Sequence, residues 1–179
     1  NIKEEIRKNL EEGILPFWIQ NGIDHEHGGY ILNFDENGKA LGDDDKMLVT
    51  QTRMIWGFSI LSRMYGNKEY LEYAKQGVDF FLDHFWDPEY GGWFWTVTPE
   101  GEMIDGGKVV YGETFAIYAL CEYVLASQDK RALEYAEKTF DLLQVYAADT
   151  LYGGYYENLE RDWSRAPFGA AAGDIKSLN

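Results

Sequence analysis

Gly91-Gly92-Trp93, near the centre of the chain, recurs on both sides as a glycine pair followed by an aromatic residue. The counterparts are Gly28-Gly29-Tyr30 and Gly153-Gly154-Tyr155, at spacings of 63 and 62 residues. The segment Leu71-Glu72-Tyr73-Ala74 also recurs 62 residues later, as Leu133-Glu134-Tyr135-Ala136. Agreement at several positions indicates a structural repeat with a period of about 60 residues.

Each period is predicted to contain a helix, a short hairpin and a second helix, because apolar residues at helical spacing flank each glycine pair. The expected helices cover residues 3–20, 48–65, 68–85, 111–127 and 130–147. Asn67 and Asp129 are the predicted N-caps of the third and fifth helices. The expected strand-like segments are 30–34, 93–97 and 153–163, with turns at 36–38 and 99–101.

The third period ends where its second helix should begin. Lys46, Lys108 and Lys176 follow the three glycine pairs at comparable distances, so Lys176 is expected to open a sixth helix that the sequence does not complete. Helical repeats need neighbours or caps to cover their apolar faces. We therefore expect residues 1–179 to be the N-terminal part of one larger barrel domain, with a complete short solenoid as the alternative. The expected repeats cover approximately 1–66, 67–128 and a truncated 129–179.

Composition excludes several classes of protein. The chain has 31 Asp and Glu against 16 Lys and Arg, a formal net charge of −15, which argues against nucleic-acid and anionic-membrane partners. With 45% hydrophobic and 16% aromatic residues, it is not a disordered chain. No apolar run approaches the roughly 20 residues that span a bilayer. The one cysteine, Cys121, cannot form an internal disulfide, which favours a reducing, cytoplasmic location.

Five local strings, taken in order, carry a family resemblance. They are Trp18 with Asp24-His25-Glu26-His27-Gly28-Gly29-Tyr30, Lys46 with Gln51-Thr52-Arg53-Met54-Ile55-Trp56, Phe115-Ala116-Ile117-Tyr118-Ala119-Leu120, Arg161-Asp162-Trp163 and Lys176-Ser177-Leu178-Asn179. Together they resemble the N-acylglucosamine 2-epimerase family, and more closely its cellobiose 2-epimerase branch, over essentially the whole chain. The resemblance implies an all-α fold, an (α/α)6 barrel with short β-hairpins between paired helices, of which this chain is about the first half.

The resemblance also implies an activity, that of an isomerase of carbohydrate metabolism. Family members move a proton at C2 of an aldose through a cis-enediolate, with two histidines as acid and base and without a cofactor or metal. Those histidines are expected after Asn179, so residues 1–179 are expected to hold no catalytic residue and to be inactive alone. The substrate stays open among the cellobiose, mannose and N-acylglucosamine classes. The reaction stays open between 2-epimerisation and aldose–ketose isomerisation. The loop Ala166–Gly173 lacks the acidic stretch of cellobiose epimerases, which keeps a monosaccharide substrate open.

Three residues match substrate-binding positions of the family. Arg53 matches the arginine that contacts the reactive sugar oxygens, Tyr111 a tyrosine near those oxygens, and Asn179 an asparagine that opens an Asn-Thr-His-Leu-His string. The repeat places all three at the start of the second helix of a pair, so they are expected at one mouth of the barrel. A guanidinium fork suits two adjacent oxygens and stabilises negative charge that develops on them. Without the resemblance, Arg53 is an ordinary surface cation, Tyr111 a core aromatic and Asn179 a helix cap.

Other functions have weaker sequence support. His25 and His27 form a His-x-His pair, but no further histidine nearby completes a coordination set, so no metal is predicted. A glycoside hydrolase on a similar barrel would need two carboxylates, for which Glu113, Glu157 and Asp162 are candidates. A non-catalytic protein-binding member of the family is a third class. The expected partners are a small sugar and the missing C-terminal half of the barrel. Without that half, the apolar seam on which its helices should dock is exposed, which predicts self-association of residues 1–179.

Overall fold

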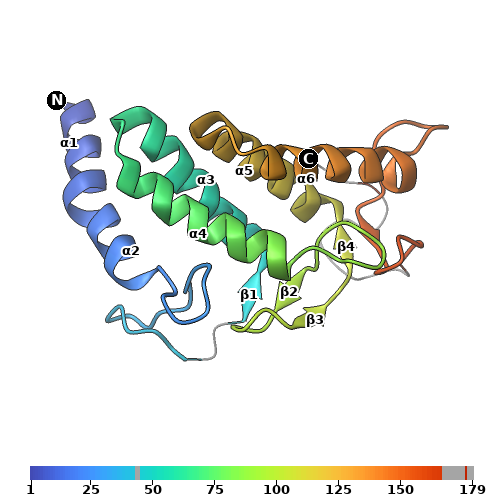
Figure 1. The fold of residues 1–179 in the computed structure, drawn as a ribbon, viewed down its shortest axis with the longest axis horizontal. Coiled ribbons are helices and arrows are strands. Elements are labelled where there is room, and N and C mark those ends of the chain that lie inside the picture. The colour runs from blue at the N-terminus through green and yellow to red at the C-terminus, as the bar shows by residue number, and fades with distance from the viewer. Residues whose placement is uncertain (43–44, 167–175, 177–179) are drawn as a thin grey trace.

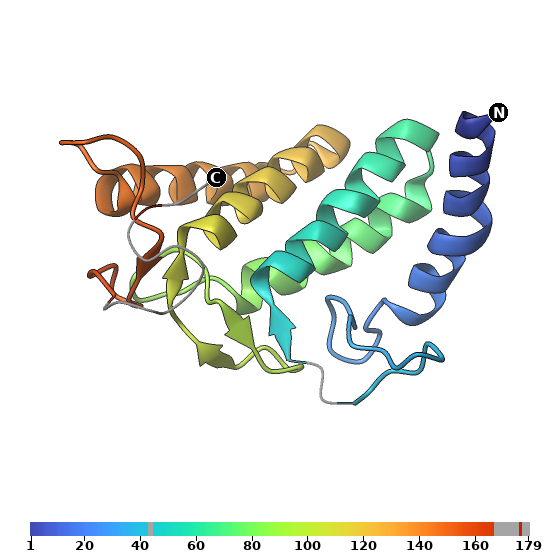
Figure 2. The ribbon, with the colours of Figure 1, turned by 180° about the vertical axis from the view of Figure 1, so that it is seen from behind.

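A computed structural model describes residues 1–42, 45–166 and 176 of the chain. Its helices lie in two layers (Figures 1 and 2). The inner layer holds α3 (Leu48–Tyr65) and α5 (Val110–Ser127), which pack against each other. The outer layer holds α4 (Lys68–His84), packed on α3, and α6 (Lys130–Leu142), packed on α5. The predicted helix pairs are therefore present.

The chain begins with a helical segment that the hydrogen-bond pattern divides in three. It consists of α1 (Ile2–Lys8), the π-helix η1 (Asn9–Ile14) and α2 (Leu15–Asn21). The prediction of a helix over 3–20 is correct in extent but misses the π-helical interruption, which contains Gly13, a residue of low helix propensity. A second π-helix, η2 (Leu143–Ala147), follows α6 in the same way.

Local capping explains where the helices begin and end. The Asn67 side chain accepts a hydrogen bond from the backbone N–H of Glu69, and the Asp129 side chain accepts one from Arg131. Both predicted N-caps are confirmed. The helix α3 is followed by its C-cap Gly66, which has the left-handed φ of 63° that a glycine adopts without a steric penalty.

Short strands lie at the end of the layers where α3 and α5 begin (Figure 1). An antiparallel sheet has the order β1 (Lys46–Met47), β2 (Thr96–Val97) and β3 (Met103–Asp105). A second antiparallel pair joins β4 (Lys108–Val109) to β5 (Asn158–Leu159). Each inner helix therefore starts directly from a strand that is paired with the next hairpin along the chain.

The predicted strands 30–34 and 93–97 are only partly correct. Tyr30 and Phe34 form isolated bridges, and only residues 96–97 of the second segment lie in a strand. The reason is that a side chain replaces the neighbouring strand. Gln51 of α3 accepts a hydrogen bond from the Tyr30 N–H at 2.9 Å and donates one to the Tyr30 carbonyl at 2.8 Å.

The core lies between the two layers and under the glycine pairs. Phe81 and Trp93 are fully buried and stack with ring centroids 4.3 Å apart, while Tyr30 stacks on Phe58 at 5.9 Å. The aromatic residue after each of the first two glycine pairs is thus a core residue that anchors its hairpin to the helices. No helix in the described ranges is both long and apolar enough to cross a membrane.

We expect the 179-residue chain to associate in solution, because large apolar side chains stay exposed at both edges of the helix layers. Examples are Ile6, Met64, Phe140 and Val145, each more than half exposed. Sedimentation velocity should give an average mass that rises with concentration above the 20.6 kDa of one chain. A Phe140→Glu variant should weaken the association, and a wild-type chain that stays monomeric at all concentrations would contradict the prediction.

Candidate functional site

Two of the three predicted site residues lie together. Arg53, in the second turn of α3, donates a hydrogen bond from Nη2 to the hydroxyl of Tyr111, in the first turn of α5, at 3.2 Å. The Arg53 guanidinium also lies 5.0 Å from the centre of the Phe115 ring, and that ring is 4.8 Å from the ring of Tyr111. Asn179 lies outside the described residues.

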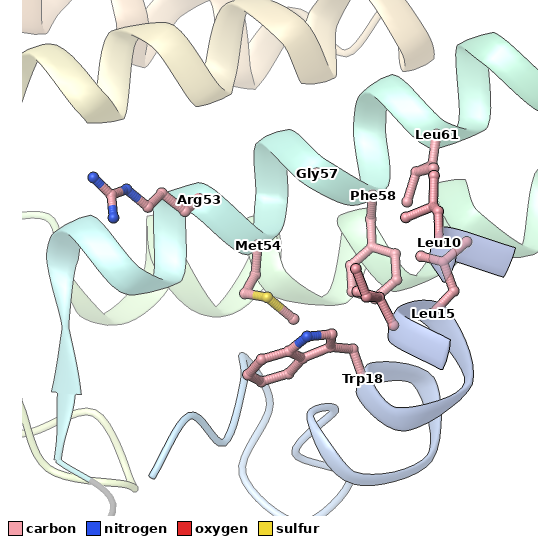
Figure 3. Close-up of a pocket in the computed structure, with 9 residues that line it drawn as sticks. Leu10, Leu15, Trp18, Arg53, Met54, Gly57, Phe58 and Leu61 are labelled. Atoms are coloured by element: carbon pink, nitrogen blue, oxygen red, sulfur yellow. The ribbon is translucent and has the colours of Figure 1, made fainter. Parts of the chain in front are cut away.

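The charge of Arg53 is available to a ligand. Its side chain is exposed, Tyr111 is half-buried, and within the described ranges Arg53 forms no ion pair with a carboxylate. Figure 3 shows the side chain extending away from the hydrophobic residues beside it. The cation is therefore held by neutral partners, the Tyr111 hydroxyl and the Phe115 ring, and can bind an anionic group.

Tyr111 is held in place by Glu157, a buried residue of the third hairpin. One carboxylate oxygen of Glu157 accepts a hydrogen bond from the Tyr111 N–H at 3.2 Å, and its carbonyl accepts one from Val110 at 2.9 Å. These bonds satisfy N–H groups that the first turn of a helix leaves unpaired. The sequence gives little signal for this role, because the corresponding positions of the earlier hairpins are Leu32 and Trp95.

A lysine and an aspartate tie each hairpin to the segment that follows it. The pairs are Lys46 with Asp24 at 2.7 Å, Lys108 with Asp87 at 3.1 Å and Lys176 with Asp149 at 2.8 Å. In each case the other oxygen of the aspartate accepts backbone N–H bonds two and three residues later. Because Lys46 and Lys108 directly precede α3 and α5, these ion pairs fix the helix starts from which Arg53 and Tyr111 project.

The middle pair carries an additional cation. Arg161 contacts both oxygens of Asp87, at 2.9 and 3.0 Å, and Asp87 and Lys108 are fully buried. Burial raises the pKa of Asp87, but hydrogen bonds from Arg161, the Glu89 N–H and Lys108 outweigh it and bring the pKa to about 2. This contact gives the Arg161-Asp162-Trp163 string a structural role.

The three carboxylates considered for glycoside hydrolysis form hydrogen bonds within the protein. Glu113 is fully buried and accepts a hydrogen bond from the Trp93 N–H at 2.9 Å, and Glu157 is buried beneath Tyr111. Asp162 is bonded to Ser164 in an exposed turn. Two of the three are therefore closed to a glycosidic oxygen or to a water nucleophile.

The histidine pair lies in an exposed turn closed by Asp24. His27 Nε2 lies 3.8 Å from Glu26 and 3.9 Å from Glu100, too far for hydrogen bonds. Among the residues the structure describes, no three His, Cys, Asp or Glu side chains lie together in a way that could hold a metal ion.

Arg53 also lines a largely apolar groove between the first helical segment and α3 (Figure 3). Its apolar side chains include Leu10, Leu15, Trp18, Met54, Phe58 and Leu61. Arg53 supplies the charged side chain among the residues that line the groove.

Comparison with known proteins assigns the fold. Residues 29–173 match the family model described as N-acylglucosamine 2-epimerase (GlcNAc 2-epimerase). The chain belongs to this family. The cellobiose 2-epimerase of Bacteroides fragilis is 35% identical over 163 residues, which are 91% of this chain and 42% of that protein. The solved cellobiose 2-epimerase of Spirochaeta thermophila is 35% identical with a TM-score of 0.89, covering 99% of this chain and 44% of that one.

These epimerases are (α/α)6 barrels, so the predicted fold class is confirmed. The chain spans about two-fifths of their length. The D-mannose isomerase of Marinomonas mediterranea is more distant, 25% identical over 152 residues that make up 85% of this chain and 38% of that enzyme. A family 76 glycoside hydrolase from Bacteroides thetaiotaomicron, 21% identical with a TM-score of 0.68 over 88% of this chain and 32% of the hydrolase, shares the fold alone.

Proposed function

We propose that the protein containing this chain is a sugar 2-epimerase or aldose–ketose isomerase that works without metal or cofactor. Its substrate is an unmodified mono- or disaccharide of the cellobiose, mannose or N-acylglucosamine class. The observation that carries the proposal is the pairing of Arg53 with Tyr111 at the start of the inner helices, where the cation has no carboxylate partner among the described residues.

The pairing suits the charge that this reaction develops. Removal of the C2 proton of an aldose spreads negative charge over the oxygens on C1 and C2, and a fixed cation with further N–H donors stabilises it. Because the Tyr111 hydroxyl accepts a hydrogen bond from the guanidinium, its own O–H is a stronger donor toward a sugar oxygen. Arg53 and Tyr111 thus form the oxygen-binding side of the site.

The remaining parts of the site belong to the same proposal. Asn179 adds a third polar group, and two histidines after Asn179 act as acid and base on the C2 proton. Residues 1–179 form the N-terminal part of one barrel domain, and the rest of the barrel packs against the apolar groove and the exposed helix edges. The protein is cytoplasmic, in keeping with the single cysteine of residues 1–179, Cys121.

Proton exchange tests the activity directly. The full-length protein is incubated with cellobiose, mannose or an N-acylhexosamine in deuterated water, and C2 deuterium is followed by NMR. We expect exchange and a 2-epimer, or a ketose for an isomerase, and no turnover by residues 1–179 alone. Cleavage of a glycosidic bond without C2 exchange would favour a glycoside hydrolase. Binding to a protein without any turnover would favour a non-catalytic member of the family. Normal turnover by residues 1–179 would contradict the placement of the histidines.

A further inference from the structure

Gln51 and Glu113 occupy the same place in successive repeats. Each lies five residues after the lysine that anchors its hairpin, Lys46 or Lys108, and each side chain reaches the backbone of the aromatic residue after a glycine pair. Gln51 makes two bonds to Tyr30, accepting from its N–H and donating to its carbonyl. An amide is suited to this role because it carries one acceptor and one donor group.

If its carboxyl group is ionised, Glu113 can form only one of the two corresponding hydrogen bonds, the one that it accepts. Its Oε1 accepts the Trp93 N–H at 2.9 Å, while its buried Oε2 has no hydrogen-bond partner among the described residues. An ionised carboxylate has no proton to donate to a carbonyl. A fully buried charge with a single hydrogen bond is also costly, so an uncharged form is favoured on both counts.

We propose that Glu113 is a neutral carboxylic acid in the folded protein and donates its proton to the Trp93 carbonyl, reproducing the bonding of Gln51. The bond holds the second hairpin on the first turn of α5. The protonation state of Glu113 does not depend on the proposed catalytic activity.

The charges around Glu113 are compatible with a neutral carboxyl group. Lys108 from β4 faces it, but the ammonium group is already paired with Asp87, which Arg161 also contacts. Burial raises the pKa of Glu113 to about 8, the Asp87 charge adds to this effect, and the Trp93 N–H and Lys108 oppose it.

The proposal predicts a particular dependence of stability on pH. A glutamate in an unfolded chain has a pKa of about 4.3, below the folded value, so its contribution to stability is complete below pH 4 and declines as the pH rises toward 8. A glutamine does not titrate. We expect the unfolding equilibrium constant of the wild type, relative to Glu113→Gln, to rise by roughly 400-fold between pH 5 and pH 8.

The experiment uses urea unfolding of the full-length protein at a series of pH values. Glu113→Gln should reduce the loss of stability that the wild type shows as the pH rises. Gln51→Glu should add a second loss of stability in the same direction. Glu72→Gln makes the same substitution at an exposed glutamate and should leave the decline in stability with pH unchanged. The infrared carbonyl band of a protonated carboxyl group should be present in the wild type at pH 7 and absent in Glu113→Gln.

Two results would overturn the proposal. One is a stability that changes with pH in the same way in the wild type and in Glu113→Gln. The other is a wild-type infrared spectrum at pH 7 without the protonated carboxyl band, and this measurement decides the question even if Glu113→Gln fails to fold.

Discussion

Replacing Arg53 with methionine should lower kcat for C2 proton exchange by about 100- to 1,000-fold, the usual effect of removing one donor from an oxyanion site. The guanidinium is the exposed cation that reaches Tyr111, so its loss removes charge stabilisation from the enediolate and leaves the tyrosine without its partner. Arg53→Lys should recover part of the rate, because it restores the charge but not the planar fork. Initial rates with the full-length protein, measured by NMR in deuterated water, give both values.

A matched control lies on the same helix. Arg63 of α3 forms an ion pair with Glu122 of α5, so it joins the same two helices as Arg53 does, but ten residues farther from the hairpin end. Arg63→Met should leave kcat unchanged. An equal loss in both variants would mean that Arg53 acts by holding α3 against α5, and an unchanged rate in Arg53→Met would remove Arg53 from the site.

The helices could be predicted well because their signals are local. The range 48–65 predicted for the second helix is that of α3, and the caps Asn67 and Asp129 act within two residues of their own position. The strands were harder to predict, since the backbone of Tyr30 is bonded to a side chain 21 residues later. Alternation of apolar residues does not reveal a hairpin that is held by a glutamine.

The same contrast applies to the candidate site. The repeat predicted that Arg53 and Tyr111 would come together, because the anchoring lysine fixes the start of each inner helix. Neither the contact of Glu157 with Tyr111 nor that of Arg161 with Asp87 could be predicted, since they join residues 46 and 74 positions apart and have no equivalent in the earlier repeats. Such contacts depend on how the hairpins stack on one another, which the spacing of residues does not encode.

Replacing Asp87 with alanine should destabilise the protein by about 3–5 kcal/mol, because it leaves the buried Lys108 ammonium without its counter-charge. Urea unfolding of the full-length protein measures the change. Asp79 is a matched control, since it also contacts two cations, Lys75 and Arg131, but at the surface. Asp79→Ala should cost no more than about 1 kcal/mol. Equal costs for the two alanine variants would contradict a special role for the buried cluster.

Two further measurements distinguish the loss of charge pairing from the loss of packing at Asp87. They are the effect of a second substitution and the dependence of stability on acid pH. Lys108→Met in the Asp87→Ala background should recover part of the lost stability, because it removes the orphaned ammonium group. The folded pKa of Asp87, about 2, lies below the roughly 3.9 of an unfolded aspartate, so its contribution is complete above pH 4 and declines as the pH falls toward 2. Asp87→Ala should lack this acid-dependent decline. If instead the double variant is less stable than Asp87→Ala and the acid profile is unchanged, Asp87 contributes packing and not charge.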